Sequence, residues 1–265
     1  MIRFDQVPVG ESMRAVFISD AHIRGHDDPN LPPLLSFLDR LDGETDRLFI
    51  VGDLFHTWFG FPRAVFDEYV PLLGALERVQ RAGVEIVYVT GNHDFEMGPF
   101  FTDLLQAEVH ETEMSLEADG RRAFVAHGDM ANPDDRHYRL LRFFLRARAT
   151  RWLARRLPPA WIWAIGQRMA ANHAGGAQGR KEADPSFKRY ADDKFAEGFE
   201  TVILGHAHVP VIRTEDDRTY VNLGDWITWR TFLRWEDGAL SLRQWCWPEE
   251  EEREFAPDGR TAQPG

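Results

Sequence analysis

Short apolar runs alternate with amphipathic segments through the first half of the chain. The apolar, β-rich runs are Arg14–Ser19, Arg47–Val51 and Val84–Val89. Between them, Leu31–Leu41 and Ala64–Ala82 carry apolar residues at the spacing of one helix face. Because the runs contain few polar positions, they are typical of strands that are buried on both faces. This part of the chain therefore predicts β-α-β units around a largely parallel sheet.

Apolar runs return in the second half, where the organisation then changes. Ala123–Ala126 and Thr201–Leu204 predict two more buried strands. After Pro210, strand-like runs follow one another with only turn residues between them, which predicts an antiparallel meander. These runs are 211–214, 219–221, 228–235 and 240–245. We expect residues 1–248 to form one domain, and the acidic, then Pro- and Gly-rich segment 249–265 to be a disordered tail.

One block interrupts this pattern with a different chemistry. From Arg136 to Lys181 the chain carries eleven Arg or Lys residues and no Asp or Glu, whereas the whole chain has a formal charge of -12. Leu, Phe, Trp and Ile recur in the block at helical spacing. We therefore expect a basic, amphipathic helical cap, inserted into the domain at about residues 134–182.

Composition and charge narrow the functional classes. The acidic total argues against general nucleic-acid binding by the protein as a whole. The single cysteine, Cys246, excludes an internal disulfide and favours a reducing compartment. The first residues lack the apolar core of a signal peptide, and no run approaches the roughly 20 apolar residues that span a bilayer. We expect a cytoplasmic protein, and a peripheral place on the inner membrane is left open.

Polar signatures follow directly after each of the five predicted core strands. They read D-A-H, G-D, G-N-H-D, H-G-D and G-H-A-H. Since the carboxyl ends of parallel strands meet along one crevice, we expect these scattered side chains to converge. Carboxylate and imidazole suit divalent Mn, Fe, Zn or Co, and a carboxylate between two ions can bridge them. The candidate metal ligands are Asp20, His22, Asp53, Asn92, His127, His206 and His208.

Each signature alone has a simpler explanation. Gly-Asp after a strand is usually a turn, and His-Ala-His is usually an ordinary strand end. Five signatures in order, each behind a β-rich run, are hard to obtain from turn composition. The sequence therefore favours a two-metal site over five unrelated turns.

Together, the five signatures resemble those of the calcineurin-like metallophosphoesterase superfamily, over about residues 14–230. The resemblance implies a four-layer α/β/β/α sandwich with a two-metal centre, for which Mn²⁺ is expected and Fe, Zn or Co are alternatives. It also implies that His93 is the catalytic imidazole and that Asp94 orients it. One ion would be held by Asp20, His22 and His208 and the other by Asn92, His127 and His206, with Asp53 bridging them.

Longer segments resemble one branch of the superfamily, the UDP-2,3-diacylglucosamine pyrophosphohydrolases of lipid A synthesis. These segments are GDLFHTWFG, HGDMANPDDRHYRLLR and the basic insertion. The branch implies a nucleotide-lipid substrate, release of UMP, and a cap that covers acyl chains or contacts a membrane. The chain departs from the branch at His93, where Arg is usual, and at Ala170 and His173. The substrate-binding positions would be Asp135, Tyr138, Arg139, Asn172 and Arg180.

These departures leave the substrate open. The same centre would serve a phosphatase or phosphodiesterase that acts on another phospholipid, a nucleotide or a phosphoprotein. A nuclease is less favoured because the basic charge is confined to the cap. A non-catalytic scaffold on the same fold is also an alternative, although all seven expected ligand positions are filled.

Overall fold

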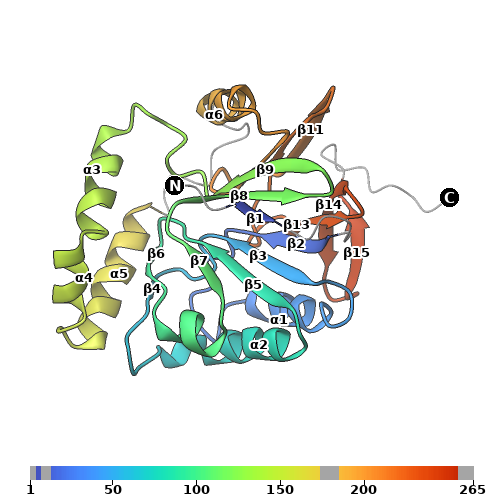
Figure 1. Cartoon of the computed structure of the whole chain (residues 1–265). Coiled ribbons are helices and arrows are strands. Elements are labelled where there is room, and N and C mark those ends of the chain that lie inside the picture. The colour runs from blue at the N-terminus through green and yellow to red at the C-terminus, as the bar shows by residue number, and fades with distance from the viewer. Residues whose placement is uncertain (1–3, 7–12, 174–184, 256–265) are drawn as a thin grey trace.

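Two β-sheets lie face to face, and helices cover their outer faces (Figure 1). The computed structural model describes residues 4–6, 13–173 and 185–255. Helices α1 (Leu31–Asp39) and α2 (Val70–Arg81) cover one sheet, and α6 (Pro185–Ala196) covers the other. The layers are those of an α/β/β/α sandwich, which confirms the predicted fold class.

The first sheet has seven strands. Its parallel part carries three of the five strands that the sequence predicts for the core, and its antiparallel part comes from the end of the chain. In spatial order the strands are β15 (Glu251–Glu254), β14 (Ala239–Cys246), β13 (Thr231–Glu236), β2 (Arg14–Ile18), β3 (Arg47–Val51), β5 (Glu85–Val89) and β7 (Glu108–His110). The carboxyl ends of β2, β3 and β5 therefore lie at one edge.

The second sheet has six strands, and its centre is again parallel. In spatial order they are β1 (Phe4–Gln6), β8 (Glu113–Ala118), β9 (Arg121–Ala126), β10 (Thr201–Leu204), β12 (Arg218–Asn222) and β11 (Val211–Glu215). A separate two-stranded ribbon pairs β4 (Trp58–Phe59) with β6 (Asp94–Glu96). Shorter helices are the 3-10 turn Asp67–Tyr69 and the π-helical turn Phe100–Leu104.

Strand residues alternate between two apolar layers. In β2, Val16 and Ile18 pack with the helices, whereas Phe17 packs between the two sheets and stacks on Phe49 at 4.3 Å between ring centroids. This follows from the two-residue period of a strand. Burying one such side chain contributes roughly 1.5–3 kcal/mol. Because both faces are buried, the strands read as continuous apolar runs.

Three helices form the cap beside this sandwich (Figure 1): α3 (Arg136–Leu145), α4 (Arg148–Ala154) and α5 (Pro159–His173). Helix α5 packs on the core through Trp163, whose ring centroid lies 4.6 Å from that of Phe66. A Cβ at Gly166 would lie 2.4 Å from Thr57 Oγ1, so glycine permits this close approach. Within the described ranges, the helices are all too short or too polar to cross a bilayer.

The structure corrects three predictions about the strands and helices. The runs after Pro210 do not form one meander, because the chain crosses between sheets after β12 and Trp226 N–H then donates to the Asp20 carbonyl. The predicted tail begins too early, since β15 pairs with β14 and Glu252 forms ion pairs with arginines of β13 and β14. Helix α2 begins at Val70 rather than in the sixties, because Pro71 is tolerated only in the first turn. Residues 256–265 of that tail lie outside the described residues.

Candidate metal centre

Five loops meet where the parallel strands of the two sheets end. In the first sheet β2, β3 and β5 lead into Asp20–His22, Asp53 and Asn92–His93. In the second sheet β9 and β10 lead into His127 and His206–His208. The predicted convergence is confirmed, and it draws on both sheets rather than on a single one.

The loops hold several of these residues in an uncommon backbone conformation. Asp20, His22, Asp53, His206 and His208 all have positive φ, between 47° and 63°. Residues with a Cβ seldom adopt this left-handed region, and those that do cluster at functional sites. The positive φ values therefore indicate that these loops are part of a functional site.

One group of potential ligands consists of Asp20, His22 and His208. Their ligand atoms lie within 4.8 Å of one another. Asp20 Oδ1 is 3.6 Å from His22 Nε2 and 3.4 Å from His208 Nε2. In the part of the chain that the structure describes, Asp20 Oδ1 and His22 Nε2 are buried without a hydrogen-bond partner. Buried polar atoms without partners are costly, so this group fits a divalent cation.

A second group consists of Asp53, His127 and His206, with Asn92 beside them. The ligand atoms of the first three again lie within 4.8 Å of one another. His127 Nε2 is 3.3 Å from Asp53 Oδ2, 3.2 Å from His206 Nδ1 and 3.1 Å from Asn92 Oδ1. Because oxygen and nitrogen donors surround one point, this group also fits a divalent cation.

Asp53 lies between the two groups. Its Oδ2 is 3.8 Å from His22 Nε2 and 3.3 Å from His127 Nε2, so one oxygen faces both. Its Oδ1 instead accepts a hydrogen bond from the His93 amide at 2.8 Å. The residues present therefore fit two divalent ions that share one carboxylate oxygen. The donor set does not distinguish Mn, Fe, Zn and Co.

Two imidazoles are oriented by hydrogen bonds on the side away from the centre. The Nδ1 atom of His127 lies 2.9 Å from the Val51 carbonyl, and that of His208 lies 3.2 Å from Asp225 Oδ2. If these Nδ1 atoms carry the hydrogen, each Nε2 presents its lone pair to the centre, as in most metal-binding histidines. Asp225 was missed in the sequence, and its signal is a lone carboxylate within the apolar Leu-Gly-Asp-Trp segment.

The carboxylates and imidazoles of the centre shift one another's pKa. Burial acts to raise the pKa of Asp53, but His127 and His93 outweigh it and hold that pKa well below its usual value. Burial lowers the pKa of His127, but the carboxylates of Asp53 and Asp20 outweigh it and raise that pKa to about 10. In the metal-free protein, protonated His127 therefore carries a positive charge that offsets the negative charges of the two buried carboxylates. A divalent ion would replace that proton, since imidazole binds metals in its neutral form.

The structure changes the role that the sequence predicts for Asp94. Its Oδ2 accepts hydrogen bonds from the Asp53 amide at 2.9 Å and the Gly91 amide at 3.0 Å. The Nδ1 of His93 instead lies 2.6 Å from the His56 carbonyl. The prediction that Asp94 orients the His93 ring is therefore wrong: Asp94 ties two metal-binding loops together. The sequence could not show this, because residue spacing does not reveal which way a side chain turns.

The predicted substrate-binding residues lie at the start of the cap. Asp135 Oδ1 accepts the Tyr138 amide at 2.9 Å and so caps α3. The Tyr138 hydroxyl donates to Asp129, two residues after His127, and Arg139 donates to the Met130 carbonyl at 3.4 Å. Tyr138 and Arg139 therefore contact the loop after β9, whereas Asp135 contacts the first turn of α3. Asn172 lies in α5, and Arg180 lies outside the described residues.

Two further cap arginines, which the sequence analysis did not select, join the cap to the centre. Arg142 forms a buried ion pair with Asp129, at 2.5 Å between Nη1 and Oδ2. Arg146 donates to the Gly91 carbonyl at 2.8 Å, next to Asn92. Their spacing of four residues, with Arg142 in the last turn of α3 and Arg146 as its C-cap, was the available signal. A cavity of about 480 Å³ lies beside them, lined by Arg146, Arg151, Arg155, Thr90 and Phe95 among others.

Comparison with known proteins gives a consistent result. A family model described as calcineurin-like phosphoesterase matches residues 13–210. A protein of Porphyromonas gingivalis named UDP-2,3-diacylglucosamine hydrolase is 28% identical over 253 residues, covering 85% of this chain and 95% of that protein. A protein of the same name from Xanthomonas campestris pv. campestris is 30% identical over 252 residues, covering 88% and 99%.

Solved structures give more distant likenesses. An uncharacterized protein of Streptococcus pneumoniae described as a predicted phosphoesterase has 16% identity and a TM-score of 0.41, with 92% of this chain and 98% of that chain covered. Zinc-bound Vps29 of Entamoeba histolytica has 15% identity and a TM-score of 0.43, with 91% and 96% covered. The family assignment rests on the sequence model, which spans most of the chain and includes every predicted metal ligand. The chain belongs to the calcineurin-like phosphoesterase family.

Proposed function

We propose that this phosphoesterase is a pyrophosphohydrolase that cleaves UDP-2,3-diacylglucosamine, or a closely similar nucleotide-linked lipid, and releases UMP. The observation that carries the proposal is the pair of ligand groups that share Asp53 Oδ2. Two ions held in this way clamp a phosphoryl group. The named activity of the curated relatives supplies the substrate class.

The bound ions, which we expect to be Mn²⁺, would act as Lewis acids and lower the pKa of water at the site. The chain itself positions the substrate and handles the proton. A hydrogen bond from His93 Nδ1–H to the His56 carbonyl would turn His93 Nε2 toward the centre, where it lies 4.0 Å from Asp53 Oδ2. When protonated, His93 would stabilise charge on the phosphoryl oxygens and pass its Nε2 proton to the departing phosphate oxygen. One water is consumed, one P–O–P bond breaks, and two phosphomonoesters form.

The cap supports an anionic, lipid-linked substrate. The guanidinium groups of Arg142 and Arg146 donate hydrogen bonds to the loops that follow β9 and β5, respectively. Such planar groups suit phosphate oxygens. The residues proposed to contact substrate remain Asp135, Tyr138, Arg139, Asn172 and Arg180.

We also propose that the cap contacts a membrane surface. Its large apolar side chains are unusually exposed, at 70% for Phe143, 62% for Trp161 and 56% for Trp152. The arginines of the cap carry the charge that anionic lipid headgroups attract. An exposed apolar and basic face of this kind would bring a lipid substrate to the centre.

Product analysis tests the proposed function. Purified protein with Mn²⁺ should convert UDP-2,3-diacylglucosamine to UMP and the lipid monophosphate, which phosphorus NMR would detect. A matched variant, Asp46→Asn at an exposed surface ion pair, should retain the activity. Turnover of nucleotide or phosphoprotein esters without UMP release from the lipid would favour a different phosphoesterase. Absence of hydrolysis on every phosphoester would leave only a scaffold role.

A further inference from the structure

We infer that His56 is a substrate-binding residue that donates a hydrogen bond to the second phosphoryl group of a diphosphate held at the metal centre. The inference rests on the proposed function, because only a pyrophosphate substrate has this second group. His56 is not among the residues that the sequence motifs select, although it lies three positions after Asp53.

The backbone of His56 is fixed on both sides. Its amide donates to the Ile23 carbonyl at 2.9 Å, and its carbonyl lies 2.6 Å from Nδ1 of His93. Its neighbours Phe55 and Trp58 are buried and stack at 4.5 Å between ring centroids. The loop therefore cannot easily swing the imidazole away, and the residue is held in place before any ligand arrives.

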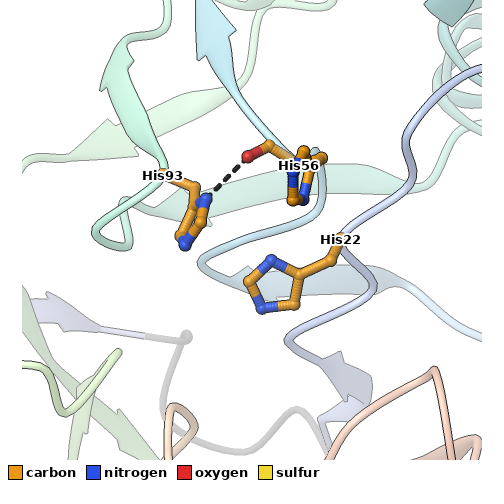
Figure 2. Close-up of side chains that lie close together, drawn as sticks. All are labelled: His22, His56 and His93. Carbon is orange, nitrogen blue, oxygen red and sulfur yellow. Dashed lines mark hydrogen bonds between the residues drawn. The ribbon is translucent and has the colours of Figure 1, made fainter. Parts of the chain in front are cut away.

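The ring of His56 faces two other imidazoles. Figure 2 shows His22, His56 and His93 around a common space, and one ligand nitrogen from each lies within 4.8 Å of the others. The His56 side chain is only 9% exposed. Among the described residues, no hydrogen bond is formed by its ring. A ligand that enters this space could therefore accept a hydrogen bond from the His56 ring.

The arrangement favours an anion over a third cation. His22 Nε2 already faces the carboxylates of Asp20 and Asp53, at 3.6 and 3.8 Å, and a third cation would compete for that ring. Within the described ranges, His56 has no carboxylate oxygen within 4.0 Å of its ring, whereas His22, His93, His127 and His208 do. A third cation near His56 would be repelled by the two ions proposed for the centre, and no carboxylate of the described residues lies close enough to offset that repulsion. A diphosphate instead brings negative charge.

The distances also indicate which phosphoryl group His56 would meet. His93 Nε2 lies 4.0 Å from Asp53 Oδ2, so His93 borders the position between the two ions, where the reacting phosphoryl group is clamped. The His56 ring lies beside that of His93, with the two ring centroids 5.8 Å apart. Among the described residues, His93 has a carboxylate oxygen within 4.0 Å and His56 does not. The second phosphoryl group, which shares an oxygen with the first, would fall between these two rings.

Helix α5 of the cap packs next to His56. Helix α5 lies directly on the next residue, Thr57, since a Cβ at Gly166 would approach Thr57 Oγ1 to 2.4 Å. Trp163 of the same helix packs on Tyr69, whose hydroxyl donates to the Thr57 carbonyl at 3.0 Å. His56 therefore lies between the metal centre and the cap, where the diphosphate of a lipid sheltered by the cap would pass.

Substitution of His56 with two substrates tests the inference. For His56→Gln and His56→Ala, kcat/KM on UDP-2,3-diacylglucosamine should fall about ten- to hundredfold, the usual loss for a hydrogen bond to a charged group. On bis-p-nitrophenyl phosphate, which has one phosphoryl group, the change should stay below about threefold. Inorganic pyrophosphate should inhibit that reaction less strongly in the variants, while inhibition by inorganic phosphate stays unchanged. The matched control is His26→Gln, whose side chain is 60% exposed.

Several outcomes would overturn the inference. Equal losses on both substrates would make His56 a general structural residue, and no loss on either would remove it from the site. Loss of one metal equivalent in His56→Ala, measured by mass spectrometry of the bound metal, would indicate a cation site. If the wild-type protein does not cleave the UDP-linked lipid, the proposed function fails, but competition by pyrophosphate still tests His56.

Discussion

The metal centre and the cap are organised in opposite ways. Asp20 and His127 are fully buried and are held by loops from both sheets. The cap instead turns Phe143 and Trp161 to solvent and covers the centre mainly through arginines. The centre is therefore organised before substrate binds, whereas the exposed apolar side chains of the cap have no covering partner among the residues that the structure describes. Under the proposed function, the core would supply the chemistry and the cap would select the molecules that reach it.

The largest expected effect is at the shared carboxylate. Asp53→Asn removes the charge that faces both ligand groups, so kcat/KM should fall at least about a thousandfold, equivalent to several kcal/mol of transition-state stabilisation. Bound metal, measured by mass spectrometry, should fall below two equivalents. Unchanged metal content and activity would show that Asp53 does not bridge.

Removing the imidazole of His93 should have the next largest effect. His93→Ala should lower kcat by about a hundredfold or more, the range for general acid catalysis. The metal content should stay unchanged, because His93 belongs to neither proposed ligand set. A loss of metal in this variant would instead make His93 a ligand.

The next prediction concerns the hydrogen bond between Asp225 and His208, which orients the His208 ring toward the centre. Asp225→Asn should weaken Mn²⁺ binding about ten- to hundredfold, the range for partners that orient metal ligands. Titration calorimetry with Mn²⁺ measures this directly. Asp216→Asn, on the exposed turn between β11 and β12, is the control. Equal affinities of the two variants would contradict the positioning role.

The smallest expected effect concerns the cap. Phe143→Ser combined with Trp161→Ser should reduce binding to anionic phospholipid vesicles by about tenfold, because two apolar side chains no longer enter the interface. Hydrolysis of the soluble ester bis-p-nitrophenyl phosphate should be unaffected. The control is Leu104→Ser, which changes a surface side chain outside the cap that is 52% exposed. Equal vesicle binding by the double variant and the Leu104→Ser control would show that the cap does not bind the membrane through these two side chains.

The sequence predicted the centre better than its surroundings, for physical reasons. Asp20, Asp53 and His127 each follow an apolar run directly, and parallel strand ends must meet at one edge. His56 and Asp225 lie on loops between elements. No local pattern marks His56, and the lone carboxylate in the apolar Leu-Gly-Asp-Trp segment is the local sign of Asp225. The orientation of Asp94 depends on two amides from different loops. Such contacts appear only when the fold is assembled.

In the fold, too, the sequence predicted the features that depend on neighbouring residues better than those that depend on distant ones. Apolar runs predicted β3 and β10 to the residue, because both faces of these strands are buried. The partner of each later strand was not predictable, since β12 pairs with β10 and β13 with β2 over long sequence separations. Helix α6 was missed although Phe187, Tyr190 and Ala191 have helical spacing, so that signal was present.

The most direct test of the account is an anomalous diffraction map from crystals of the Mn²⁺-loaded protein. The account predicts two peaks roughly 3.5–4 Å apart on either side of Asp53 Oδ2. One should be bound by Asp20, His22 and His208, and the other by Asn92, His127 and His206. A single peak, or a peak among His22, His56 and His93, would contradict the shared-carboxylate centre.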